Sequence, residues 1–266
     1  MPETYSHSRL ATFETCRRQY RYRYIDKLPR QGIGVEAHTG SAVHKALEGL
    51  YRSCQKGRIP SQEEVLGLYQ QAWEAVPPRQ LKIVKPNFVA RDYQDLGRYC
   101  VQSYYRQFHP FNQSEVLALE ARVELFLDAG RQHRLIGYID RVDRCRDGIL
   151  EIHDYKTSAS LPRTRDLDAD RQLTIYEMGL RQRYPEARGF RHVWHYLTFG
   201  QTHVRTRDGV HCRRVTEACE AIIQQIKKEN RYPASTGILC HWCDFSTECP
   251  EGRDYLSRNA PPGLKV

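Results

Sequence analysis

The chain has 266 residues, 40% of them hydrophobic and 27% charged, which is typical of a globular protein that buries a sizeable core. The sequence contains no run of about 18 apolar residues and no secretion signal at its start, so we expect no membrane contact and a cytoplasmic location. The formal net charge of +9 favours a polyanionic partner such as nucleic acid, although many basic proteins bind none.

The first part of the chain shows mainly helical periodicity. Apolar residues recur every three to four positions, and Pro77-Pro78 and His109-Pro110 mark two of the helix ends. The expected helices cover residues 6–20, 41–53, 61–76 and 92–108, with a loop over 79–91. The second of these helices is expected to begin at Gly40-Ser41.

The second part of the chain changes between strand and helix patterns. We expect, in order, strands 116–128, 134–144 and 149–156, helix 166–184, strands 190–198 and 202–207 around Gly200, helix 214–230, and a cysteine-rich tail. This order predicts one α/β domain over residues 1–266, built on a central mixed β-sheet flanked by helices.

A run of arginines and tyrosines lies near the N-terminus: Arg17, Arg18, Tyr20, Arg21, Tyr22, Arg23 and Tyr24. Arginines can neutralise phosphates, and aromatic rings can stack on bases. The same pattern also fits tyrosines packed on a core with the arginines in solvent. The run by itself therefore does not establish nucleic-acid binding.

The expected strand 149–156 ends in two charged residues on its apolar face. Side chains alternate along a strand, so Leu150, Ile152, Asp154 and Lys156 share one face. Burying Asp154 and Lys156 on that face would be costly unless they are paired or bind an ion.

The preceding strand brings a second carboxylate, Asp140, whose position depends on the turn between the strands. A three-residue loop, Arg146 to Gly148, would pair Cys145 with Ile149 and place Asp140 opposite Asp154, with Cβ atoms about 5 Å apart. Two carboxylates this close repel unless a cation lies between them, and Mg²⁺ or Mn²⁺ suits such oxygen ligands. A two-residue loop would instead turn Asp140 to the other face.

This arrangement would allow hydrolysis of a phosphodiester. Asp140 and Asp154 would hold the metal at the scissile phosphate, and Lys156 would orient or deprotonate a water or stabilise the transition state. A surface hairpin with a solvated ion pair remains an equal alternative from these residues alone.

Further motifs extend the pattern over most of the chain. They are, in order, Tyr5-Ser6-His7-Ser8-Arg9-Leu10, then Gly40-Ser41-Ala42-Val43-His44-Lys45-Ala46-Leu47-Glu48, Gly137-Tyr138-Ile139-Asp140-Arg141, Asp154-Tyr155-Lys156 and Gln172-Leu173-Thr174-Ile175-Tyr176. The ordered set resembles the PD-(D/E)XK nuclease superfamily, and more narrowly its RecB-type exonucleases, which include the AddB nuclease domain and a CRISPR-associated exonuclease. The resemblance implies a restriction-endonuclease-like fold.

The resemblance also implies roles for individual residues. It assigns metal binding to His44, Asp140, Asp154 and the Tyr155 carbonyl, and it places Gln172 and Tyr176 with Asp140, Asp154 and Lys156 among the catalytic residues. Gln172 and Tyr176 are four residues apart and share a helix face. Without the resemblance they read as a solvated glutamine and a packing tyrosine, and His44 as a structural histidine. Glu120 matches a recurring glutamate, for which we expect a supporting role.

The tail contains three cysteines, Cys240, Cys243 and Cys249, close enough to bind one metal or cluster, and a fourth ligand is needed. The resemblance supplies Cys16 and implies a [4Fe–4S] cluster that joins residues 1–30 to residues 232–252. Thiolate spacing alone does not distinguish such a cluster from Zn²⁺. We assign no function to the remaining cysteines, which are Cys54, Cys100, Cys145, Cys212 and Cys219.

Together with the resemblance, these observations predict a Mg²⁺- or Mn²⁺-dependent DNA exonuclease in repair, recombination or defence. It would bind single-stranded or duplex DNA ends and prefer single-stranded ends. The alternatives are a non-catalytic DNA-binding subunit of a repair complex and a structure-specific endonuclease. The sequence has no G-x-x-x-x-G-K-[ST] motif, so a helicase or another repair or defence partner would supply any ATP-driven unwinding.

Overall fold

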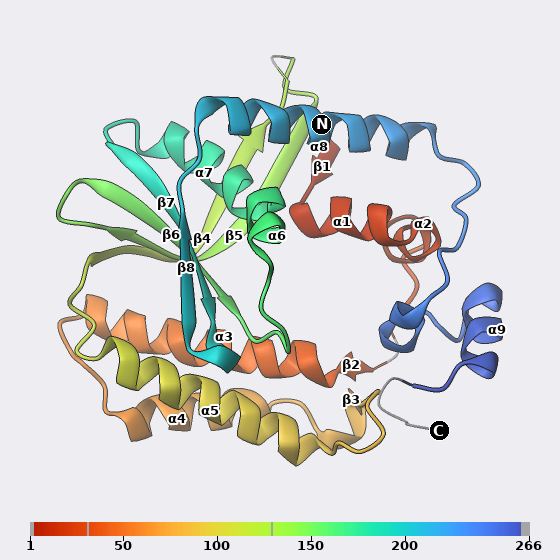
Figure 1. Cartoon of the computed structure of the whole chain (residues 1–266), viewed down its shortest axis with the longest axis horizontal. Helices are drawn as coiled ribbons and strands as arrows, with labels where there is room; N and C mark the ends of the chain where they lie inside the picture. The colour runs from red at the N-terminus through yellow and green to blue at the C-terminus, as the bar shows by residue number, and fades with distance from the viewer. Residues whose placement is uncertain (1–2, 31, 129, 262–266) are drawn as a thin grey trace.

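The computed structural model describes residues 3–30, 32–128 and 130–261. Helices cover both faces of a β-sheet (Figure 1). The α-helices are α1 (His7–Thr15), α2 (Arg17–Tyr20), α3 (Val35–Gln55), α4 (Gln62–Glu74), α5 (Ala90–Phe108), α6 (Thr164–Ala169), α7 (Gln172–Arg183), α8 (Gly209–Lys228) and α9 (Pro250–Arg258). Shorter helical turns are η1 (Arg21–Ile25), η2 (Pro78–Gln80), η3 (Leu197–Phe199) and η4 (Ile238–Trp242).

The main sheet is mixed, as the element order predicted. Its strands are β1 (Glu3–Tyr5), β4 (Glu115–Phe126), β5 (His133–Arg144), β6 (Ile149–Lys156), β7 (Gly189–Tyr196) and β8 (Gln201–Arg205). β5 pairs antiparallel with β4 and β6 and parallel with β1. β6 and β7 are parallel, and β7 and β8 are antiparallel. A separate pair joins β2 (Ile33–Gly34) to β3 (Leu81–Lys82).

Two hydrophobic cores hold the helices on the sheet. One contains Leu10 of α1, Leu180 of α7 and Ile223 of α8, together with Ile152 of the sheet. The other contains residues of α3, α4 and α5 together with Tyr155 of β6. Tyr155 therefore points to the opposite face from Ile152, as side-chain alternation along β6 requires.

Two expected helix boundaries are wrong. The helix expected over 6–20 is interrupted at Cys16, which is extended (φ −158°, ψ 113°), so that α1 ends and α2 begins there. The helix expected to start at Gly40-Ser41 begins at Val35, because Val35, His38 and Thr39 are buried and continue its inner face. Gly40 lies inside α3, where its open side accommodates the Thr157 hydroxyl.

Other expected elements differ in extent. The helix expected over 166–184 is two helices, α6 and α7, separated by Asp170 and Arg171. The expected loop 79–91 contains β3 and the first residues of α5, and α8 begins at Gly209 because Asp208 caps it. The expected strands 116–128, 134–144, 190–198 and 202–207 shift by one to two residues at their ends, whereas strand 149–156 is confirmed at both ends.

None of the helices within residues 3–30, 32–128 and 130–261 is both long and apolar enough to cross a membrane.

Candidate active site

Three carboxylates lie side by side across three neighbouring strands. Glu120 of β4 is flanked by the pairs Leu119–Arg141 and Ala121–Ile139, so it stands opposite Asp140 of β5. The β5–β6 register pairs Arg141 with His153, which continues to Asp140 opposite Asp154. Glu120, Asp140 and Asp154 therefore form a row of negative charge across the sheet.

The turn between β5 and β6 sets this register. The Cys145 amide donates to the Ile149 carbonyl at 2.9 Å, and the Gly148 amide donates to the Cys145 carbonyl at 3.0 Å, so Arg146 to Gly148 form the loop. Gly148 has φ +81°, a conformation that favours glycine. The three-residue loop is confirmed, and the two-residue alternative is wrong.

The backbone around Asp140 departs from a regular ladder. The paired residues of β5 and β6 end at Arg141 and His153, and the Tyr155 amide instead donates to Asp140 Oδ2 at 2.8 Å. Glu120 has φ +47°, which is uncommon for a non-glycine residue and redirects its side chain within β4. These two irregularities bring carboxylate oxygens of neighbouring strands together at one place.

Helix α3 adds a histidine to this place. His44 Nε2–H donates to the Tyr155 carbonyl at 2.8 Å, and its Nδ1 lies 3.3 Å from Asp140 Oδ1. Ligand atoms of His44, Glu120 and Asp140 all lie within 4.8 Å of one another, the one such group of three among the described residues. A cavity of about 480 Å³ opens beside His44 and Glu120.

The electrostatics of the group are those of crowded carboxylates. Burial, together with the neighbouring Asp140, raises the pKa of Asp154 to about 6, although Lys156 opposes the shift. Burial and Asp140 also raise the pKa of Glu120. Burial lowers the pKa of His44, but the hydrogen bond to Asp140 and the nearby carboxylates outweigh it and raise the pKa to about 9. A divalent cation would relieve this repulsion, and one nitrogen with carboxylate oxygens is a donor set that Mn²⁺ and Mg²⁺ accept.

Lys156 and Gln172 complete the other end of the row. Lys156 Nζ lies 2.7 Å from Asp154 Oδ2 and donates to Gln172 Oε1 at 3.2 Å. The Gln172 amide donates to Asp154 Oδ1 at 3.3 Å and to the Tyr176 hydroxyl at 3.1 Å. Burial lowers the pKa of Lys156, but Asp154 outweighs that effect and the pKa is raised, so the side chain is a cation at neutral pH.

A glycine allows α7 to reach this position. A Cβ atom at Gly137 would lie 2.2 Å from Tyr176 Cε1, so any other residue would push the tyrosine ring off β5. The first residue of the Gly137-Tyr138-Ile139-Asp140 motif thus provides the close approach of α7. That approach places Gln172, one turn before Tyr176, beside Lys156.

The opposite face of the hairpin holds a buried polar network that the sequence analysis did not identify. Arg141 Nη1–H donates to the hydroxyls of Tyr104 and Tyr155, both at 2.7 Å, and Arg141 Nε lies 2.9 Å from Asp143 Oδ1. Arg141 and Asp143 are 4% and 1% exposed. The network fixes the ring of Tyr155, the residue between Asp154 and Lys156 in the sequence, and so anchors the strand that carries both.

Three further residues of the site were missed or underestimated. Glu120, for which only a supporting role was expected, shares the one close group with His44 and Asp140. Burial, together with the nearby positive charges of Arg171 and Lys156, lowers the pKa of His7 of α1 to about 4. Asp170 lies close to the same histidine and opposes this shift without outweighing it. The motif beginning at Tyr5 was the only sequence signal that pointed to His7.

The four predicted cluster cysteines also come together. Cys16, Cys240, Cys243 and Cys249 line one cavity, although Cys16 lies near the N-terminus and the other three lie in the tail. The Ser235 amide donates to Cys16 Sγ at 3.4 Å, and the Gly252 amide donates to Cys249 Sγ at 3.3 Å. No three of these sulfur atoms lie within 4.8 Å of one another in the described structure, whereas four ligands of one zinc ion lie about 3.8 Å apart.

Replacement of His44 by alanine is expected to weaken Mn²⁺ binding by about tenfold or more, because it removes the one nitrogen ligand of the group. Calorimetric titration of the metal-free protein with Mn²⁺ measures the effect. His109→Gln, at an exposed residue, is the control. Equal Mn²⁺ affinity in the wild type and His44→Ala would show that the ion binds elsewhere.

The model of the PD-(D/E)XK nuclease superfamily matches residues 4–250. A presumed exonuclease from Eubacterium rectale shares the fold, with a TM-score of 0.54 and 14% identity over 90% of this chain and 86% of that one. The structure of SSO0001 aligns over 84% of this chain and 88% of its own at 18% identity, with a TM-score of 0.37 that is too low for comparing folds.

No curated protein matches the chain. The family model nevertheless spans most of its length and includes the row of carboxylates, Lys156 and Gln172. The chain therefore belongs to the PD-(D/E)XK nuclease superfamily.

Proposed function

We propose that the protein is a deoxyribonuclease that requires Mg²⁺ or Mn²⁺ and degrades DNA from its ends, with a preference for single strands. The observation that carries the proposal is the row of Glu120, Asp140 and Asp154. His44 lies close to Glu120 and Asp140, and the Lys156–Gln172 pair lies beside Asp154. This arrangement combines a cation site with a fixed ammonium group, the two features that phosphodiester hydrolysis needs.

The residues divide the chemical work between them. His44, Glu120 and Asp140 would hold the metal ion together with Asp154 and the Tyr155 carbonyl. When bound, the ion supplies Lewis-acid stabilisation of phosphoryl charge and lowers the pKa of water. Asp154 keeps Lys156 in its charged form. Lys156 is therefore better suited to stabilise the negative charge that develops on the phosphoryl group than to remove a proton from water. Gln172 fixes both Asp154 and Lys156, and Tyr176 in turn fixes Gln172.

The DNA substrate and the action at DNA ends are each supported by one observation. The chain carries an excess of nine positive charges, which favours a polyanion. The structure from Eubacterium rectale that shares the fold is described as a presumed exonuclease. We also propose a role in repair, recombination or defence in the cytoplasm, with a helicase or another protein of that pathway as partner.

The substrate form is tested with end-labelled linear single strands, end-labelled linear duplexes and covalently closed circles. In Mg²⁺ or Mn²⁺ we expect the linear single strand to be degraded fastest and the circle to remain intact, and no cleavage in EDTA. Cleavage of the circle would overturn the exonuclease assignment, because only an endonuclease can begin there.

We further propose that Cys16, Cys240, Cys243 and Cys249 bind a [4Fe–4S] cluster that joins residues 1–30 to residues 232–252. Their shared cavity and the two amide donors to sulfur support it. The cavity measures about 20 Å³, so a cluster would displace side chains that now line it. Bound there, the cluster would link the break between α1 and α2 to the N-terminus of α9.

Replacement of Cys243 by serine is expected to abolish the iron content of anaerobically purified protein and to lower its unfolding temperature, because the link between the two ends of the chain is lost. Iron, sulfide and zinc analyses, together with the visible absorbance, measure the result. Cys212→Ser, at a cysteine outside the cavity, is the matched control. Stoichiometric zinc without iron in the wild type would contradict the cluster.

A further inference from the structure

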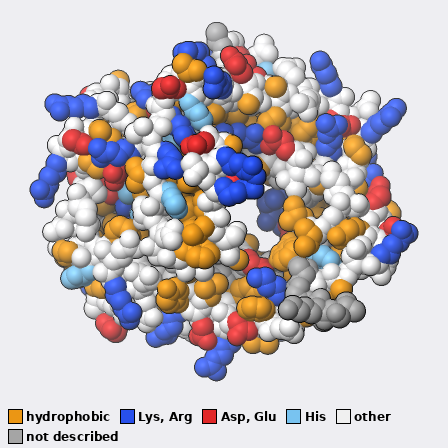
Figure 2. Space-filling model, viewed as in Figure 1, with side chains coloured by type: hydrophobic (Ala, Val, Ile, Leu, Met, Phe, Trp, Pro, Cys, Tyr) orange, Lys and Arg blue, Asp and Glu red, His pale blue; other side chains and the backbone are white. Residues whose placement is uncertain are grey.

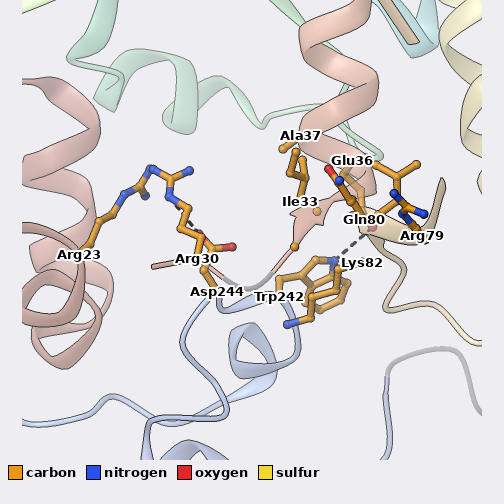
Figure 3. A pocket seen from close by; sticks show the side chains of 13 residues that line it. Arg23, Arg30, Ile33, Glu36, Ala37, Arg79, Gln80, Lys82, Trp242 and Asp244 are labelled. Atoms are coloured by element: carbon orange, nitrogen blue, oxygen red, sulfur yellow. Dashed lines mark hydrogen bonds and ion pairs between the residues drawn. The ribbon is translucent and has the colours of Figure 1, made fainter. Parts of the chain in front are cut away.

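A second and larger cavity lies next to the proposed active site. It has a volume of about 920 Å³ and is formed by η1, the segment after it, the start of α3, β3 and the cysteine-rich tail. Figure 3 shows Arg23 and Arg30 on one side of it, and Arg79, Glu36 and Trp242 on the other. In the space-filling view an opening passes through the molecule above α3, with lysine and arginine side chains at its rim (Figure 2).

The lining is basic, and two of its arginines are available for a ligand. Arg30 makes an ion pair with Asp244 at 3.7 Å, and Lys82 donates to the Cys243 carbonyl at 3.0 Å. Arg23 and Arg79 make no ion pair with any part of the chain that the structure describes. A guanidinium group without a carboxylate partner is well suited to a phosphate.

The cavity also contains an oriented aromatic ring. The Trp242 indole N–H donates to Glu36 Oε1 at 3.2 Å, and the Tyr93 hydroxyl donates to the same oxygen at 3.2 Å. Trp242 is only half-buried, so the hydrogen bond holds one edge of the indole while part of the ring stays accessible. An anchored indole among arginines can stack on one base while the arginines hold its phosphates.

The cavity is connected to the metal site along α3. Ala37 lines this cavity and also the smaller one that contains His44 and Glu120. Ala37 and His44 are seven residues apart, so they lie on the same helix face about 10 Å from each other. That separation corresponds to about three stacked nucleotides of a strand at about 3.4 Å each.

We propose that this cavity is a nucleotide-binding subsite for the DNA strand whose phosphodiester lies at the metal site, with one base on Trp242 and phosphates on Arg23 and Arg79. The inference rests on the proposed nuclease function and adds the residues that hold the strand away from the reacting bond. The subsite would make the enzyme prefer single strands, because a base inside a duplex cannot stack on the indole.

Binding is tested without cleavage, in Ca²⁺ in place of Mg²⁺, with a short fluorescein-labelled single-stranded oligonucleotide. Trp242→Ala and Arg79→Ala are each expected to weaken binding by about 5- to 100-fold. The matched controls are Tyr99→Ala and Arg98→Ala, which alter an exposed aromatic and an exposed arginine on α5 outside the cavity. Arg79 lies on a different segment from the cysteines, so its variant keeps the test valid if Trp242→Ala disturbs the tail.

Tryptophan fluorescence gives a second readout. The chain has three tryptophans, and Trp73 and Trp194 are 6% and 0% exposed, so base stacking is expected to quench Trp242 alone. Quenching by the oligonucleotide should vanish in Trp242→Phe, which keeps an aromatic ring for the base. Quenching that persists in Trp242→Phe, or unchanged affinity in both Trp242→Ala and Arg79→Ala, would overturn the subsite.

A free deoxynucleoside monophosphate distinguishes a subsite for a DNA strand from a site for a free nucleotide, because both ligands offer a base and a phosphate. We expect the oligonucleotide to quench at much lower concentration than the mononucleotide, since only the strand also reaches the metal site. Equal potency would overturn the strand subsite in favour of a free-nucleotide site. Weakened binding in the variants, combined with no cleavage by the wild type in Mg²⁺ or Mn²⁺, would uphold the subsite and reject the nuclease function.

Discussion

Replacement of Lys156 by alanine is expected to lower the rate of DNA cleavage by about 10²- to 10⁴-fold. The Lys156 ammonium is the cation fixed beside Asp154, at 2.7 Å, and Gln172 holds it from the other side. Because the group is two-thirds shielded from water, its charge acts on a phosphoryl group with little screening. Alanine removes the charge and leaves the Asp154 carboxylate in place.

The effect is measured by single-turnover cleavage of end-labelled DNA at saturating Mn²⁺. Among the residues that the structure describes, the Asp154 side chain of Lys156→Ala would keep only the Gln172 hydrogen bond, so the variant could lose stability. Thermal unfolding of each variant therefore separates loss of chemistry from loss of fold. Lys228→Ala, at the exposed end of α8, is the matched control and should cleave at the wild-type rate. A folded Lys156→Ala protein with the wild-type rate would remove Lys156 from the catalytic residues.

Replacement of Arg141 by alanine is expected to destabilise the protein by about 3–5 kcal/mol. The change leaves the carboxylate of Asp143 buried, and its remaining partners within residues 3–30, 32–128 and 130–261 are the Ser114 hydroxyl, at 2.6 Å, and His153, at 3.3 Å. It also removes the donor to the Tyr104 and Tyr155 hydroxyls. Burial tends to raise the pKa of Asp143, but Arg141 outweighs it and the pKa is lowered to about 2, so the carboxylate depends on this partner.

Urea unfolding of the wild type and the variant measures this difference. Arg144→Ala is the matched control on the same strand, because Arg144 is 42% exposed and its ion pairs with Glu115 and Glu186 measure 3.6 and 3.8 Å. The control should change stability by less than about 1 kcal/mol. Equal losses in the two variants would mean that the buried network contributes no more than a surface ion pair.

Side-chain alternation and turn chemistry were sufficient to predict the hairpin. The Asp147-Gly148 pair marked the turn, and the alternation along β6 put Asp154 and Lys156 on one face. The register between the two strands depended only on the loop length, which the sequence left open between two and three residues. The structure shows the loop of three residues. Strand 149–156 was predicted correctly at both ends because charge and turn residues bound it.

Other features depend on tertiary contacts that no local pattern records. Glu120 joins His44 and Asp140 because of a positive φ angle within β4, which its sequence does not signal. Arg141 and Asp143 alternate with apolar residues along β5, a pattern typical of a strand with one solvent-exposed face. Both residues are instead buried beneath α3 and α5. Glycine at position 40 suggested a helix start, whereas α3 begins at Val35 because Val35, His38 and Thr39 are buried.

The cavity around Trp242 likewise depends on tertiary contacts that the sequence does not reveal. Its lining comes from four separate segments, and Trp242 reads in the sequence only as a residue between two cysteines. The run of arginines and tyrosines near the N-terminus divides between two environments. Tyr20 is fully buried in the core, whereas Arg23 lines the cavity.

The central claim is that a divalent ion held at Asp140 drives cleavage, and one titration tests it most directly. Metal-free wild type and Asp140→Asn are mixed with end-labelled single-stranded DNA, and Mn²⁺ is added in steps. We predict no cleavage by either protein without metal, cleavage that rises with Mn²⁺ in the wild type, and none in Asp140→Asn at any concentration that saturates the wild type. Cleavage without metal, or equal Mn²⁺ dependence in the two proteins, would contradict the account.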